Sequence, residues 1–81
     1  MTPAALSPRR HHVLRLAANG HTNAQIGREL DIRPRTVDRH LAEVYARLGA
    51  RDRAHAVAIA LAVGELGVHE IHIPDQHGAA A

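Results

Sequence analysis

Two arginines and two alanines recur on one side of a helix that the sequence predicts between residues 34 and 49. On an ideal helix, these four side chains point almost directly away from the apolar residues of the same segment. They are Arg35, Arg39, Ala42 and Ala46. A guanidinium can donate two parallel hydrogen bonds to guanine O6 and N7, and an alanine methyl can pack against a thymine methyl. This arrangement predicts a helix that reads base edges in the major groove of duplex DNA.

Asp38 lies at the flank of this face, and the residues alone leave its role open. Its carboxylate can accept from the amino group of cytosine, or it can hold a neighbouring arginine in the rotamer that reaches a base. The competing interpretation is an ordinary solvated face, stabilised by an i,i+4 pair such as Arg39 with Glu43. We prefer the groove interpretation, because a solvated face usually mixes long charged side chains more fully.

The opposite side of the same helix is apolar at the spacing of one helix face. It carries Val37, Leu41, Val44 and Leu48. Pro34 suits the first helical position and Gly49 is a typical C-terminal stop. Only residues 31–33 separate this helix from the one before it, which is the length of a helix-turn-helix connection.

The preceding helix begins with a capping-box pattern, Thr22 with Gln25 three residues later. Ile26 and Leu30 form its predicted buried pair. Gly27 offers the small side chain that a close crossing with the next helix requires. These features strengthen the helix-turn-helix interpretation.

Two further helices complete an all-α fold of four helices, the third of which is the recognition helix. Ser7 is the predicted N-cap of the first, and Asp52 caps the fourth, which ends at Gly64. The predicted organisation is an N-terminal arm at 1–5, one domain at 6–67 and a C-terminal tail at 68–81. In the tail, "VHEIHI" alternates like a strand but has no evident partner strand in this chain, and "PDQHGAAA" is typical of a disordered end, so the structure of the tail stays open.

Composition excludes several classes of protein. The 81 residues suffice for one domain, and the absence of cysteine excludes a disulfide framework and a thiol nucleophile. The longest apolar run, at 56–63, is well short of the ~20 residues that a membrane span needs. Without a signal-peptide pattern, we expect a soluble cytoplasmic protein.

Charge is distributed unevenly along the chain. Residues 1–53 hold all ten basic residues, every one an arginine, against five acidic residues, which gives +5. Residues 54–81 hold three acidic and no basic residues, which gives −3. The basic part favours a polyanionic partner.

Neither an enzyme nor a metal site is predicted, and no cofactor is expected. The serine and threonine residues are explained as helix caps or phosphate contacts. The candidate metal ligands of the tail match no standard zinc spacing. They are His69, His72, Asp75 and His77.

A specific motif spans the third helix and the start of the fourth. It consists of Thr36-Val37, His40, Val44, Arg47-Leu48 and Arg53. With this motif, residues 6–66 resemble the LuxR-type (GerE-type) helix-turn-helix domain of bacterial transcription regulators. The resemblance implies a sequence-specific DNA-binding transcription regulator whose third helix enters the major groove. The chain is too short for an added receiver or ligand-binding domain. We therefore expect a stand-alone regulator or a response-regulator effector domain.

The resemblance also implies roles for individual residues. The side chains that face bases are those of Asp38, Arg39 and Ala42, to which the helix-face argument adds Arg35. The residues that approach phosphates are Asn23, Thr36, Val37 and Arg47. The chain departs from the family pattern in the first helix, where Arg10 and His12 replace glutamates. It departs also at Asp31, which replaces a glycine, at Arg33, which replaces an N-capping Ser or Thr, and at Gly27, which replaces an alanine.

The fourth helix carries two predicted apolar surfaces, which favour a homodimer on an inverted-repeat promoter site. One comprises Ala54, Val57, Ala58, Leu61 and Ala62, and the other Ile59, Ala60, Val63 and Leu66. The predicted interface draws on both: Val57, Ala58, Ile59, Leu61 and Ala62. RNA polymerase is a further implied partner, and no membrane contact is expected. The alternative function is a small helical protein-interaction module that uses the apolar helix 53–66.

Overall fold

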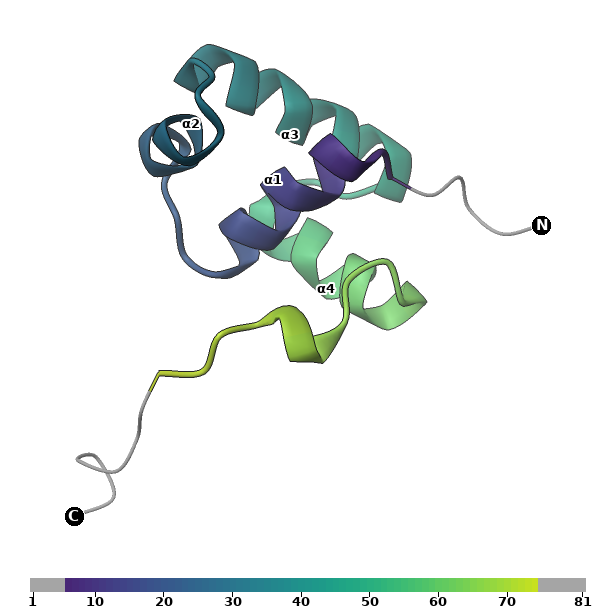
Figure 1. The fold of residues 1–81 in the computed structure, drawn as a ribbon. Helices are drawn as coiled ribbons and strands as arrows, with labels where there is room; N and C mark the ends of the chain where they lie inside the picture. The colour runs from purple at the N-terminus through teal and green to yellow at the C-terminus, as the bar shows by residue number, and fades with distance from the viewer. Residues whose placement is uncertain (1–5, 75–81) are drawn as a thin grey trace.

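The computed structural model describes residues 6–74 and shows four α-helices followed by one short 3-10 helix (Figure 1). They are α1 (Pro8–Ala18), α2 (Asn23–Leu30), α3 (Pro34–Leu48), α4 (Arg53–Val63) and η1 (Val68–Glu70). No strand occurs within this range, and the all-α prediction is confirmed. The predicted N-terminal arm, and most of the end predicted to be disordered, lie outside the described residues.

Side-chain caps begin three helices where the sequence predicts them. The Ser7 hydroxyl accepts from a backbone N–H of the first turn of α1 at 3.2 Å. Thr22 and Gln25 exchange the two hydrogen bonds of a capping box, at 3.1 and 2.8 Å. The Asp52 carboxylate accepts from the first turn of α4 at 2.8 Å. Each cap satisfies an N–H group that has no partner inside its helix.

The connection between α2 and α3 is tight because of two backbone features. Asp31 adopts the left-handed conformation at φ 57°, the position where the family pattern has glycine. Gly27 accepts a hydrogen bond from the Ile32 N–H at 2.9 Å. A Cβ on Gly27 would lie only 2.5 Å from the Ile32 carbonyl oxygen, so the crossing requires glycine at this position.

Two buried clusters meet on α1 and join the helix-turn-helix pair to α4. One cluster comprises Leu6, Leu14, Val44, Ala56, Ala60 and Leu66. The other comprises Val13, Ala17, Ile26, Val37 and Leu41. Tyr45 packs against both clusters. Helix α1 thus packs against the apolar face of α3, and the opposite face of α3 is left uncovered (Figure 1).

The inward face of α4 differs from both predicted stripes. Ala56 is fully buried but belongs to neither stripe, and Ala60 and Leu66 are buried with it. Val63, which belongs to the same predicted stripe as Ala60 and Leu66, is 52% exposed. The second predicted surface is therefore wrong as a single face. Because nearly every residue of α4 is apolar, the spacing alone could not select the side that packs.

The alternation at 68–73, which leaves the structure of the tail open, does not form a strand, since these residues form η1 and an extended segment on α1. His11 Nε2 lies 3.1 Å from a carboxylate oxygen of Glu70. The Asn19 amide donates to the Glu70 carbonyl at 3.0 Å and accepts from the His72 N–H at 2.6 Å. Side chains of α1 and its C-cap thus provide the hydrogen bonds that a neighbouring strand would otherwise provide.

Candidate nucleic-acid interface

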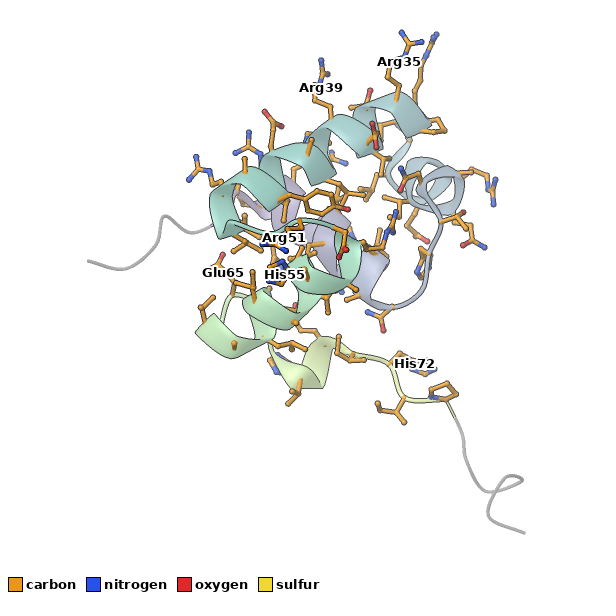
Figure 2. The ribbon with its side chains drawn as sticks, turned by 180° about the vertical axis from the view of Figure 1, so that it is seen from behind. Arg35, Arg39, Arg51, His55, Glu65 and His72 are labelled. Atoms are coloured by element: carbon orange, nitrogen blue, oxygen red, sulfur yellow. The ribbon has the colours of Figure 1, made fainter. Side chains whose placement is uncertain are left out.

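Helix α3 separates a packed apolar face from an exposed face that carries arginines. Val37, Leu41 and Val44 are at most 2% exposed. The exposed residues of the opposite side are Arg35, Asp38, Arg39, Ala42 and Ala46. Figure 2 shows Arg35 and Arg39 projecting from α3, away from the rest of the molecule. All four predicted base-reading residues therefore share one exposed face.

The ion pairs of α3 test one feature of the solvated interpretation, the i,i+4 pair of Arg39 with Glu43. Glu43 pairs with Arg10 of α1, whose Nη2 lies 3.0 Å from Glu43 Oε2. Arg39 forms no ion pair with any residue that the structure describes, so the i,i+4 pair of the solvated interpretation is not made. The guanidinium of Arg39 is left free for an external acceptor.

Two of the predicted phosphate contacts occupy accessible places at the ends of α3. Thr36 is half-buried in the first turn, and Arg47 is exposed in the last turn. Val37 is different, because its side chain is 0% exposed and its N–H already donates to the Arg33 carbonyl at 3.1 Å. Val37 is therefore a core residue, and the prediction that it approaches a phosphate is wrong.

Asn23, the remaining predicted phosphate contact, is the first residue of α2 and is half-buried. Its side-chain oxygen accepts from Arg53 Nη2 at 2.5 Å. The other terminal nitrogen of Arg53 donates to the His21 carbonyl at 3.1 Å. Arg53 therefore links the start of α4 to the start of α2, although it lies 30 positions from Asn23 and 32 positions from His21 in the chain.

Sequence reasoning missed the parts that Arg10 and Arg53 play. Both hold residues of the candidate interface from another helix, and neither lies on the exposed face of α3. The family motif includes Arg53, which indicates that this residue matters, but the motif does not predict its contact with Asn23. No local spacing could have paired Arg10 with Glu43.

His40 of the family motif is half-buried on α3, and its buried Nδ1 atom has no hydrogen-bond partner among the described residues. The nearest ionic group is Glu43, whose Oε1 lies 3.8 Å away.

Burial shifts two titrating groups near the helix-turn-helix unit. It lowers the pKa of His12, and the charges of Arg15 and Arg9 lower that pKa further. Burial also raises the pKa of the Tyr45 phenol, which packs between the two core clusters. Both side chains are therefore uncharged at neutral pH, so neither adds to the charge that a ligand would meet.

Other features of residues 6–74 offer little chemistry. A shallow open hollow on α2 is lined by His21, Gln25, Arg28 and Glu29. Within this range, no three histidine or acidic side chains are grouped so that they could hold a metal ion. Two of the four tail residues considered as metal ligands, Asp75 and His77, lie outside it. None of these helices has the length and apolarity needed to cross a bilayer.

The predicted dimer residues of α4 divide by exposure. Ala58 and Ala62 are exposed, whereas Val57, Ile59 and Leu61 are half-buried. Val57 and Leu61 pack partly against the core cluster that includes Leu14. Of the predicted dimer residues, the exposed ones are therefore the two alanines.

Two helices joined by a three-residue turn, with an exposed arginine face on the second, define a helix-turn-helix protein. The model of the GerE family, the bacterial regulatory proteins of the LuxR family, matches residues 4–60. The chain belongs to this family.

Curated relatives agree over the same region. The transcriptional activator protein BjaR1 of Bradyrhizobium diazoefficiens is 43% identical over 56 residues, which cover 69% of this chain and 23% of that protein. The transcriptional regulatory protein FixJ of Rhizobium meliloti is 44% identical over 59 residues, 73% of this chain and 29% of that protein. The FixJ of B. diazoefficiens is 36% identical over 63 residues, 78% and 31% respectively. The chain thus spans less than a third of each of these relatives.

Proposed function

We propose that the chain binds duplex DNA sequence-specifically, with α3 in the major groove, and thereby regulates transcription. The observation that carries this proposal is the pair of exposed arginines on α3, Arg35 and Arg39, whose guanidinium groups point outward (Figure 2). The packing of the opposite face determines that these arginines lie on the uncovered side of α3. No catalytic step is part of this function. Since bacterial DNA lies in the cytoplasm, the proposal includes a cytoplasmic location.

In this proposal, base reading falls to the exposed face of α3. Arg35 and Arg39 donate to guanine, and Ala42 contacts a thymine methyl. Asp38 accepts from a cytosine amine or orients a neighbouring arginine. Phosphates are contacted by Thr36 and Arg47 at the two ends of α3, and by Asn23 at the start of α2.

The proposal includes a second copy of the chain at α4. Exposed Ala54, Ala58 and Ala62 recur every four residues, which makes a ridge that permits close approach of two helices. Val63 beside it is 52% exposed. Two-fold symmetry then requires an inverted-repeat site, with half-sites spaced to match the two α3 helices. Contact with RNA polymerase stays a prediction.

The experiment is selection of bound sequences from a random duplex pool, followed by affinity measurements on the selected site. Arg39→Ala should weaken binding by ~1–3 kcal/mol and relax the preference at one base pair. Arg47→Ala should weaken all sequences alike and reduce the slope of log affinity against log salt by ~0.9. If no sequence is enriched, the proposed function is wrong and the protein-interaction module takes its place.

The dimer has its own test in Ala58→Glu, which places a charge on the α4 ridge. At concentrations where the parent places two copies on the inverted repeat, sedimentation of the DNA-bound variant should show one copy, with affinity for the inverted repeat reduced to that for a single half-site. His69→Glu, an exposed change outside α4, is the matched control. A parent protein that binds a lone half-site as tightly as the inverted repeat would exclude the dimer.

A further inference from the structure

Arg53 lies at the first turn of α4, yet its guanidinium reaches the segment that begins α2. One terminal nitrogen donates to the Asn23 side-chain oxygen at 2.5 Å, and the other donates to the His21 carbonyl at 3.1 Å. Both hydrogen bonds are part-buried and join residues about 30 positions apart. The planar guanidinium thus fixes two acceptors at once.

The contact with Arg53 determines which end of the Asn23 amide is available to a ligand. A guanidinium only donates, so it can bind the amide oxygen and not the amide nitrogen. The two N–H donors of Asn23 are left over, and a phosphate oxygen can only accept. Without Arg53, the amide could rotate by a half-turn about χ2, whose preference is broad and roughly two-fold.

The charge of Arg53 is a second contribution at the same place. Within residues 6–74 no carboxylate lies within ion-pair distance of this guanidinium, whose two recorded acceptors are both uncharged oxygens. Its positive charge therefore remains uncompensated beside the N-terminus of α2. The partial positive charge of the helix end adds to it, and both favour an anion.

We propose that Arg53 is a positioning residue for DNA binding: it turns the Asn23 amide so that its N–H groups meet a backbone phosphate. This inference rests on the proposed function, because it assumes that the α2 N-terminus approaches DNA. Arg53 itself makes no phosphate contact in this arrangement. It couples the first turn of α4 to a DNA-contacting residue of α2.

The test is a double-mutant cycle of Arg53→Met and Asn23→Ala, with affinity measured on the selected duplex well below the melting temperature of each variant. Asn23→Ala should weaken binding about 10-fold, as loss of a hydrogen bond to a charged group does. Arg53→Met should weaken binding about 5-fold in the parent but less than about 2-fold in the Asn23→Ala background. A merely structural role of Arg53 would lower the melting temperature but give equal losses in both backgrounds, which would overturn the inference.

The salt dependence separates positioning from direct contact. Arg53→Met should reduce the slope of log affinity against log salt only slightly, through the loss of a nearby charge, whereas a lost phosphate contact would reduce it by about 0.9. Such a reduction would overturn the inference. Arg53→Lys, which keeps the charge and one donor, should recover most of the affinity. Arg53→Ala replaces the Met variant in the cycle if that variant does not fold.

Arg51→Met is the matched control for loss of one arginine near the start of α4. Arg51 is exposed, and Figure 2 places it beside α4, away from Arg35 and Arg39. It should change affinity less than about 2-fold. If the parent protein binds no duplex selectively, the proposed function fails and this inference fails with it. If the parent binds selectively but Arg53→Met binds equally well, only the inference about Arg53 is wrong.

Discussion

Arg10→Ala removes the α1 partner of Glu43 and should weaken DNA binding without touching the reading face itself. In the structure Arg10 holds the Glu43 carboxylate at 3.0 Å. Arg39 lies four residues before Glu43, one helical turn away, where the two side chains can pair once Arg10 is gone. Loss of Arg10 would therefore tie up a base-reading arginine and expose a negative charge on α3.

The expected magnitude follows from two small terms. An exposed i,i+4 pair is worth about 0.3 kcal/mol in this order of the two charges, and DNA binding must break it. An unneutralised carboxylate about 8 Å from a phosphate costs about 0.5 kcal/mol in water. The sum is about 0.8 kcal/mol, which corresponds to about 4-fold weaker binding. Because the Glu43 side chain is 43% exposed, salt should reduce the effect.

Fluorescence anisotropy on the selected duplex checks this in a cycle of Arg10→Ala and Glu43→Gln. The amide substitution should restore the affinity that Arg10→Ala loses, because no carboxylate then remains to capture Arg39. Arg9→Ala is the matched control, since Arg9 is an exposed neighbour on the same helix. An equal loss on Arg10→Ala in the Glu43→Gln background would refute the reasoning and point to a direct contact of Arg10 with DNA.

Three further predictions concern the fold that supports the interface. Gly27→Ala should destabilise the protein by about 1–2 kcal/mol, although alanine favours helix, because its Cβ would meet the Ile32 carbonyl at 2.5 Å. In thermal melts, the difference between Arg28→Ala and Arg28→Gly measures the helix propensity of alanine over glycine at an exposed neighbouring position. A Gly27→Ala variant that is more stable than the parent would contradict the close crossing. Leu66→Ala, at 1% exposure, should cost about 2–5 kcal/mol in urea unfolding; a loss below about 1 kcal/mol would show that the segment after α4 is not part of the core. The Gly67 N–H, together with His11, lowers the pKa of the Glu70 carboxyl, so Glu70 adds stability above its ordinary pKa of about 4.5 that is lost as pH falls through the lowered value. Glu70→Gln should therefore lower the melting temperature at pH 7 but not near pH 2; an equal loss at both pH values would exclude the linkage.

Local signals in the sequence were sufficient for the helices and for the reading face. Ser7, Thr22 and Asp52 cap the helices that they were predicted to cap, because a cap acts on N–H groups two or three residues away. The buried and exposed sides of α3 follow from a spacing of three and four residues along one segment. Such short-range patterns are fully contained in the order of the residues.

The packed side of α4 could not be decided in the same way. An almost wholly apolar helix offers several equivalent stripes, and only the shape of the surface formed by α1 and α3 selects Ala56 and Ala60. The structure of the segment at 68–73, which the sequence left open, could not be decided for a related reason. Its alternation is compatible with a strand, but the backbone there found its hydrogen bonds on α1.

By itself, the sequence determined which residues are exposed on α3, because that choice depends on neighbours within one helix. The tertiary structure alone decided how that face is supported. Arg10 meets Glu43 and Arg53 meets Asn23 across 33 and 30 positions of the chain. Contacts at such separations depend on how the helices cross, and no periodicity in the sequence encodes a crossing. The same two arginines would be ordinary surface charges if the helices packed at another angle.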